Sequence, residues 1–170
     1  PARLARAAAD GQPVLAPGAP GRHLQLIDAR DLAAWTLALL DQGAAGAFNA
    51  VSPPGAITWG SLLAACAAAA GVQPTLRWVD DDLLLAQGVG PWMELPLWIP
   101  ASGPDAADSA AFMAVPTHRA QASGLRCRPI GDTVADTLAW WRALPAQRQV
   151  FAATGLAPAR EAAVLAAAGG

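Results

Sequence analysis

Apolar and polar positions alternate along the chain in a way that predicts short strands joined to amphipathic helices. Leucine and isoleucine dominate residues 24–27, which predicts a short buried strand. Over residues 28–40 apolar side chains recur at helical spacing and predict a helix with one apolar stripe, formed by Leu32, Trp35, Leu39 and Leu40. A second apolar run, at 46–51, predicts the next strand. This order of strand, helix and strand is typical of an α/β protein.

Polar residues and glycines mark where these helices begin and end. Asp28 stands where its carboxylate can accept hydrogen bonds from the first helical turn, and Asp31 adds negative charge where the helix dipole favours it. Gly43 follows the helix at a position that tolerates a positive φ. Thr58 is a good N-cap for a second helix, which Gly71 ends.

The rest of the pattern is of the same kind. It predicts an opening helix up to Ala9 and strands at 75–79 and 111–115. It also predicts a helix after Asp80–Asp82 that Gly88 ends, helices over 117–123 and from Gly131, and a tail helix at 158–168 that packs loosely or frays.

The acidic run Asp80–Asp82 has two interpretations, a metal site or a helix start. Three adjacent aspartates cannot all face one ion, which favours the helix start.

Residues 89–110 lack periodicity. The stretch Gly90–Pro100 mixes prolines with Trp92 and Trp98, and proline prevents regular structure there. Because exposing two tryptophans to water is costly, this segment must cover something. It covers either the core of the domain or a ligand, with Glu94 orienting a hydroxylated substrate in the second case.

Composition bounds the class of protein. The chain has 170 residues, of which 54% are hydrophobic and 14% charged, enough for one globular core. All 11 basic residues are arginines, and the net charge of −2 gives nucleic-acid binding little support. Cys66 and Cys127 are too few for a disulfide framework, and a catalytic cysteine would need His23 or His118 as its partner. The longest apolar run is too short to span a bilayer and no signal peptide is visible, so we expect a cytoplasmic protein without membrane contact.

Several segments together resemble one enzyme family. They are Ile27–Ala33, Gly46–Asn49, Thr58–Leu63, Arg119–Ala120, Gly124–Leu125 and Thr133–Trp140. In order and spacing they resemble the C-terminal half of extended short-chain dehydrogenases/reductases (extended SDR), the NAD-dependent epimerase/dehydratase family. The resemblance covers about residues 4–141 and is densest at 24–63 and 119–141.

This resemblance implies an α/β fold, the C-terminal part of a Rossmann-type extended SDR fold with a small substrate-binding lobe and no N-terminal nucleotide-binding domain. Residues 1–144 would form the sheet edge and the lobe, and 145–170 a helical tail. The family transfers a hydride between a nicotinamide and a carbinol, using a glycine-rich turn and a Tyr-xxx-Lys pair. This chain has no G-x-G-x-x-G and contains neither tyrosine nor lysine. We therefore expect NAD or NADP in a parent protein and no cofactor bound by this chain alone.

The same resemblance points to candidate substrate-binding residues. Arg22 could pair with a phosphate or carboxylate, although a solvated loop arginine is the simpler interpretation. Trp92, Trp98 and Glu94 are the other candidates, whereas no catalytic, cofactor-binding or metal-binding residue is assigned. Capping explains Asp28 and Asp31 without a ligand. Three further residues are expected to have no catalytic role: Arg30 on the surface, His118 exposed at a helix start, and Asn49 as a buried strand amide.

The sequence thus predicts the substrate-binding portion of an NAD(P)-dependent epimerase, dehydratase or reductase, inactive by itself. Its partners would be the missing N-terminal Rossmann domain and a small-molecule substrate, either a sugar nucleotide or another carbonyl or hydroxyl compound. The sparse charge favours the second kind of substrate, and a homodimer is compatible with this prediction. The alternative is a non-catalytic binding or interaction protein derived from the same family. An opening helix that is already under way at Pro1 fits a fragment.

Overall fold

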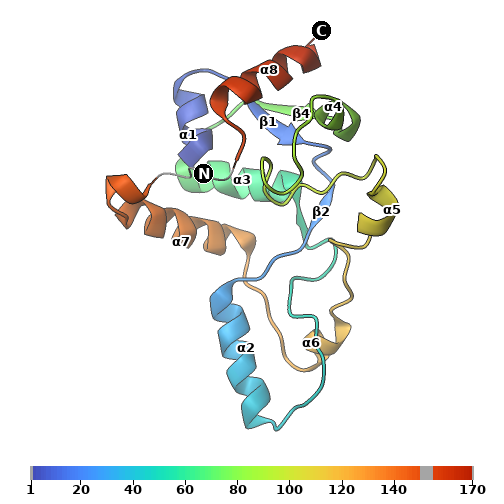
Figure 1. Cartoon of the computed structure of the whole chain (residues 1–170). Helices are drawn as coiled ribbons and strands as arrows, with labels where there is room; N and C mark the ends of the chain where they lie inside the picture. Colours follow the sequence, from blue (N-terminus) through green and yellow to red (C-terminus); the bar gives the residue numbers. More distant parts are fainter. Residues whose placement is uncertain (1, 150–154, 170) are drawn as a thin grey trace.

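The computed structural model of the chain describes residues 2–149 and 155–169, and it is mixed α/β (Figure 1). The elements follow in the order α1 (Ala2–Ala9), β1 (Val14–Pro17), β2 (His23–Leu24), α2 (Ala29–Asp41), β3 (Ile57–Thr58), α3 (Trp59–Ala70), β4 (Leu76–Val79), α4 (Asp81–Ala86), α5 (Ala106–Ser109), α6 (His118–Ala122), α7 (Ile130–Ala143), the 3-10 helix η1 (Ala146–Arg148) and α8 (Pro158–Gly169).

Two small sheets make up the β structure. β1 and β4 run parallel, with Val14 opposite Leu76 and Pro17 opposite Val79. β2 and β3 run antiparallel, with His23 opposite Thr58. Between β1 and β4 the chain passes through β2, α2, β3 and α3, which is the long crossover that a parallel pair requires.

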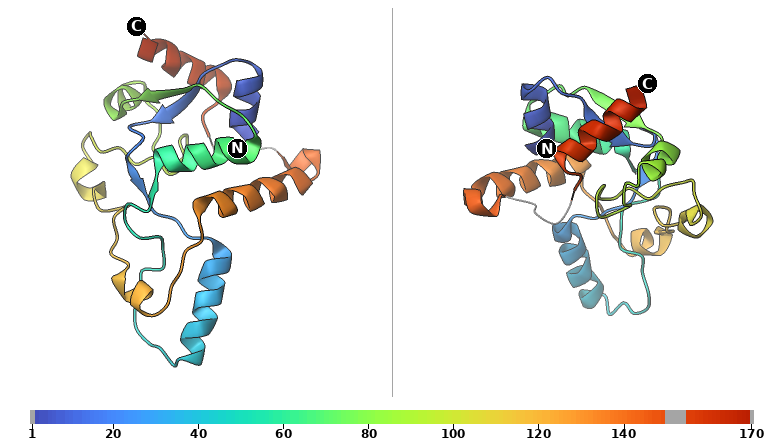
Figure 2. Two further views of the ribbon diagram at one scale, coloured as in Figure 1. Left: turned by 180° about the vertical axis from the view of Figure 1, so that it is seen from behind. Right: turned by 45° about the horizontal axis from the view of Figure 1, so that its top comes forward.

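The helices lie in two groups. α3 packs against α1 and α7, and α8 contacts β4 of the parallel pair. α2 projects away from this body, and α6 lies near the loop that follows α2 (Figure 2). The indole N–H of Trp35 on α2 donates to the carbonyl of Ser123 at 3.3 Å, which ties α2 to the end of α6.

The buried side chains form two clusters that match these groups. The larger one is built from Leu15, Leu24, Ile57, Trp59, Val79, Leu84, Val89, Leu95, Trp98, Leu156 and Val164. The smaller one contains Trp35, Ala120 and Leu125, with Phe48 packed against Trp35 edge to face at 5.5 Å between ring centroids. The larger cluster therefore stabilises the body, and the smaller one holds α2 to α6.

The predicted helix signals are confirmed. The Asp28 side chain accepts from the backbone N–H of Arg30, and Thr58 forms a capping box with Ser61. Gly71 ends α3 in the left-handed region at φ 70°, where a residue with a Cβ would be strained. The predicted strand at 75–79 is confirmed as β4, and helices are found near 117–123, from residue 130 and at 158–169.

Two predicted strands are wrong, and a third is shorter than expected. Residues 46–51 are irregular because the described chain places no strand beside them. Residues 111–115 begin as a turn, in which Ala114 N–H donates to Ala111 O at 3.0 Å. The strand predicted at 24–27 is reduced to β2, since only His23 and Leu24 pair with β3. Apolar composition alone does not make a strand where no neighbour accepts its hydrogen bonds.

The apolar stripe predicted for α2 is only partly buried. Trp35 lies in the smaller cluster, but Leu32 and Leu40 are exposed. The tail helix, in contrast, is firmly packed over its described residues. Val164 of α8 is fully buried, and the backbone N–H of Leu15 donates to Oε1 of Glu161 at 2.9 Å. These contacts contradict the expectation that residues 158–168 pack loosely or fray.

The exposed face of α2 predicts that this chain associates with itself. Leu37 is 64% and Leu40 71% exposed, and they lie three residues apart on one side of the helix. Replacing both (Leu37→Glu with Leu40→Glu) should shift sedimentation-velocity profiles toward monomer. The same change at two exposed alanines of α8, Ala162→Glu with Ala163→Glu, is the control. Equal association in both variants would show that the α2 face is not responsible.

Candidate functional site

A buried carboxylate, Asp81, lies at the centre of the first candidate site. Arg22 binds it in a fork, with Nη1 2.8 Å from Oδ1 and Nη2 2.6 Å from Oδ2. The same carboxylate accepts hydrogen bonds from Nε1 of Trp98 at 2.9 Å and from the backbone N–H of Ala101 at 2.6 Å. Because a forked guanidinium–carboxylate pair fixes direction as well as charge, Asp81 at the start of α4 holds two other segments, around Arg22 and at 98–101, in one geometry.

Gly18 makes room for this arginine. Its N–H donates to the carbonyl of Val79 at 2.7 Å, and its φ is +66°. A Cβ at this position would lie 2.6 Å from Cζ of Arg22. Any other residue at position 18 would therefore push the guanidinium away from Asp81, and only glycine meets both demands.

The environment of Asp81 keeps its side chain ionised. Burial by itself raises the pKa of this carboxyl, but hydrogen bonds from Arg22, from the Ala101 N–H and from Trp98 outweigh burial, and the pKa is lowered. The Asp81 side chain is 6% exposed and that of Arg22 24%. The pair is thus a partly buried ion pair and not a solvated loop arginine beside a capping aspartate.

The acidic run therefore has a different role from the one predicted. α4 does begin there, but Asp80 at its N-cap makes no side-chain capping hydrogen bond. Asp81 is buried and bonds across the fold, whereas Asp82 is exposed. Sequence reasoning did not distinguish the three aspartates, since partners 59 residues before and 17 residues after Asp81 decide its role. Within residues 2–149 and 155–169, no group of three His, Cys, Asp or Glu side chains could hold a metal ion.

A cavity of about 350 Å³ lies next to this ion pair. Apolar side chains form much of its wall: Leu24, Trp59, Leu97, Ile99 and Met113. Arg22, His23 and Ser109 add polar groups. Leu97, in the proline-rich loop that contributes to this wall, has a φ of +68°, which is unusual for a residue with a branched side chain.

The four predicted substrate-binding residues have different environments. Trp98 is fully buried in the larger cluster and shares Asp81 with Arg22, so the structure brings these two together. Trp92 is 44% exposed, has φ +63°, and stacks edge to face with Phe112 at 5.8 Å. Glu94 turns back onto its own loop, where Oε2 accepts from the N–H of Gly90 at 2.6 Å. Of the four, only Arg22 lines the cavity.

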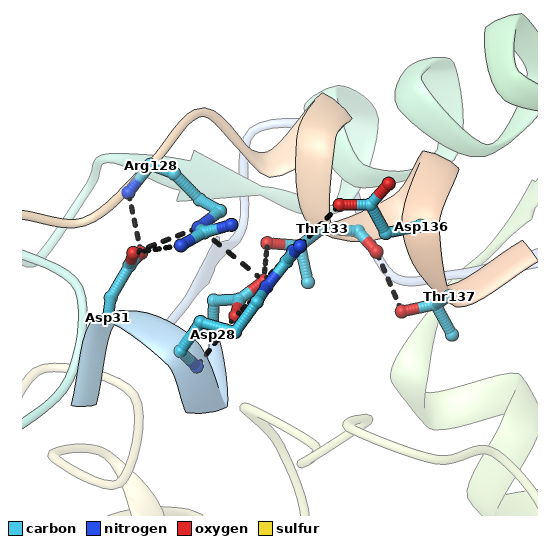
Figure 3. Close-up of polar contacts among 7 residues, drawn as sticks. Asp28, Asp31, Arg128, Thr133, Asp136 and Thr137 are labelled. Atoms are coloured by element: carbon cyan, nitrogen blue, oxygen red, sulfur yellow. Dashed lines mark hydrogen bonds and ion pairs between the residues drawn. The ribbon is translucent and has the colours of Figure 1, made fainter. Parts of the chain in front are cut away.

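A second polar network joins the start of α2 to the start of α7 (Figure 3). Oδ2 of Asp28 accepts from the hydroxyl of Thr133 at 2.8 Å and from Nη2 of Arg30 at 2.7 Å. Asp31 accepts from the backbone N–H of Arg128 at 2.8 Å, and its Oδ1 accepts from Nη2 of Arg128 at 2.6 Å. Arg30 also reaches Asp136 on α7, so it is a linking residue and not only a surface residue.

These contacts shift the acidity of both aspartates. The Arg30 guanidinium holds the pKa of Asp28 well below its usual range, with Thr133 and Arg128 adding to the effect against burial. Arg128 lowers the pKa of Asp31 in the same way. Asp28 therefore does more than cap α2, because it also binds α7 through Thr133. A second cavity of about 490 Å³ borders this network, with Cys127 in its wall.

The two cysteines, His118 and Asn49, which the sequence analysis also considered, lie in surroundings that give no sign of a catalytic role. Cys66 and Cys127 are free thiols, and burial raises the pKa of both, which favours the unreactive thiol form. His118 is exposed at the start of α6, as predicted. Asn49 binds the carbonyl of Pro116 at 2.9 Å, but it is exposed and not in a strand.

Gln25 is a buried residue that sequence reasoning missed. Its Nε2 donates to the carbonyls of Ser52 and Val115, at 2.8 and 3.0 Å, and its Oε1 accepts from the N–H of Val115. The side chain thereby bonds two loops that lie far apart in sequence. The only sequence signal is a polar residue inside an apolar run, which is weak evidence.

Comparison of the chain with protein-family models, curated proteins and solved structures gave no match. Across the described part of the chain, none of the helices combines the length and apolar character needed to cross a bilayer.

The aspartate pair predicts a stability that depends on pH. Because the folded pKa values of Asp28 and Asp31 lie below the ordinary 3.8, the unfolded chain binds more protons than the folded chain as pH falls through that region. The stabilisation is complete above the ordinary value and is lost progressively below it. Urea unfolding at a series of acidic pH values should show this loss, and Asp31→Asn should make it smaller. Asp10→Asn, in the exposed turn after α1, is the control and should follow the unsubstituted chain.

Trp98 and Trp92 offer a matched pair of tryptophan substitutions. Trp98→Ala empties a fully buried site and removes one donor to Asp81, so it should cost about 3–5 kcal/mol of unfolding free energy. Trp92→Ala removes a ring that is 44% exposed and should cost about 1 kcal/mol or less. Denaturant titration followed by circular dichroism measures both. Similar costs for the two variants would contradict the core role of Trp98.

Proposed function

We propose that the chain is the C-terminal substrate-binding portion of an NAD(P)-dependent epimerase, dehydratase or reductase of the extended SDR family. One observation carries the proposal. The two segments with the densest resemblance to that family, 24–63 and 119–141, meet in a single network through Asp28 with Thr133 and Asp31 with Arg128. Segments that form one unit in a family are expected to make such contacts with each other.

The arrangement of secondary structure is a second support. The parallel pairing of β1 with β4 across a crossover that contains helices is the type of connection found in α/β enzymes. In the proposed protein these strands belong to the substrate-binding lobe of a Rossmann-type fold. The nucleotide-binding domain is contributed by a separate, N-terminal part.

The division of labour in this proposal follows from the residues that the chain contains. A nicotinamide, when bound, supplies or accepts the hydride. The sequence has no glycine-rich G-x-G-x-x-G turn, no tyrosine and no lysine, so its residues do not fit the binding of that cofactor. What this chain contributes is a cavity beside the Arg22–Asp81 pair, whose shape and polarity select the substrate.

A second candidate is a non-catalytic binding or interaction protein derived from the same family. The exposed leucines of α2, Leu37 and Leu40, favour it, because an apolar helix face is a common contact surface for another protein. Both candidates keep the same lobe. They differ in whether a catalytic domain is attached to it.

The decisive experiment is to determine the coding sequence that precedes the codon for Pro1. The proposal expects an in-frame strand, glycine-rich turn and helix, followed by a Tyr-xxx-Lys pair. The complete reading frame, once expressed, should oxidise NADH or NADPH in the presence of a carbonyl substrate. A start codon directly before Pro1 would contradict the proposal and favour the non-catalytic candidate.

A binding measurement on the chain alone complements this experiment. Because the pyrophosphate-binding turn is missing, we expect no saturable quenching of the seven tryptophans by NADH at micromolar concentrations. N-acetyltryptophanamide titrated with the same concentrations of NADH is the control for absorption of tryptophan emission by NADH itself. Saturable quenching by NADH would show that the chain itself has a cofactor site.

A further inference from the structure

The cavity beside Arg22 has the properties of a small and nearly neutral binding site. Its volume of about 350 Å³ is at the lower end of the range for ligand pockets, about 300–1,000 Å³. Leu24, Trp59 and Met113 contribute apolar wall from three different parts of the chain. This size suits a ligand with one substituted ring better than a nucleotide joined to a sugar.

The charge of the cavity wall is already balanced. Arg22 is the only arginine among the described residues that line it, and both of its terminal nitrogens bind Asp81, at 2.8 and 2.6 Å. Nη1 also donates to the carbonyl of Ile99 at 3.3 Å. An incoming diphosphate would have to displace a carboxylate that also accepts hydrogen bonds from Trp98 and Ala101. Phosphate recognition usually depends on arginines that are free to form such forked contacts.

One polar side chain remains as a donor for a neutral ligand. His23 lines the cavity and can donate a hydrogen bond to a carbonyl or hydroxyl oxygen, whereas the hydroxyl of Ser109 already donates to the carbonyl of Asp105 and can only accept. Apolar walls with a few convergent polar groups are the usual composition of a small-molecule site. The wall therefore matches a ligand with an apolar body and a single polar end.

We infer that this cavity binds a neutral, largely apolar carbonyl compound and excludes sugar nucleotides. That such a compound is the substrate rests on the proposed function, whereas its chemical class rests on the volume and charge of the cavity. The Arg22–Asp81 pair determines this selectivity, since it removes the one guanidinium that a diphosphate would need.

Isothermal titration of the whole chain with two probes tests the inference. The neutral ketone 4-phenyl-2-butanone should bind, and UDP-glucose should bind at least about tenfold more weakly, which corresponds to about 1.4 kcal/mol. Equal or tighter binding of UDP-glucose would overturn the inference. Absence of ketone binding up to millimolar concentration would overturn it as well.

Replacing single alanines by leucine, inside and outside the cavity wall, locates the binding site. Ala110 lines the cavity and is exposed, so Ala110→Leu should fill the space without disturbing the core and weaken ketone binding about tenfold or more. Ala107→Leu, exposed on α5 and outside the cavity wall, should leave binding unchanged. Circular dichroism checks that both variants fold, and Ala114→Leu provides a second way to fill the cavity. Equal binding by the cavity-filling variants and the control would place the ketone elsewhere and overturn the inference.

The outcomes separate this inference from the proposed function. Ketone binding that depends on Ala110, together with no NAD(P)H oxidation by the complete reading frame, would refute the enzyme and leave the cavity assignment standing. Turnover of a UDP-sugar by the complete protein would support the proposed enzyme and refute the cavity assignment.

Discussion

Asp81 is the charge on which the body of the molecule depends. A carboxylate that is only 6% exposed is costly to keep ionised unless each oxygen is hydrogen-bonded. Here Oδ1 accepts from Arg22 and Trp98, and Oδ2 accepts from Arg22 and Ala101. Because these donors come from before β2 and from the proline-rich loop, one side chain orders segments that have little regular structure of their own. Removing it would leave the indole N–H of Trp98 without its acceptor and Arg22 with only the carbonyl of Ile99.

The network at Asp28 and Asp31 does comparable work at the other end. It joins the first turn of α2 to α7 and to the segment before α7, so α2 keeps its place although most of its surface faces solvent. Asp28 is as little exposed as Asp81, at 6%, but its arginine partner is more accessible: the Arg30 side chain is 49% exposed and that of Arg22 24%. Salt and acid should therefore weaken this network before they affect the core.

The function proposed for the chain joins these two constraints. The Asp28 network brings the two family-like segments together, and the Asp81 network shapes the cavity and balances its charge. In the proposed function, a substrate lobe built in this way would select by shape and by the absence of free charge. Such selection favours neutral compounds, since a diphosphate gains nothing in a wall whose arginine is already paired.

The sequence by itself determined the local structure. In ending and starting helices, Asp28, Thr58 and Gly71 act through neighbours within four residues, so helix starts and ends could be predicted from short patterns. Apolar pattern alone wrongly predicted strands at 46–51 and 111–115, because a strand exists only when another strand accepts its hydrogen bonds. The geometry of the candidate site was likewise not predictable from short sequence patterns. Arg22 was foreseen as a possible anion ligand, but its pairing with Asp81, 59 residues away, was decided by tertiary structure alone, since only the folded chain brings a guanidinium and a carboxylate within 2.6 Å.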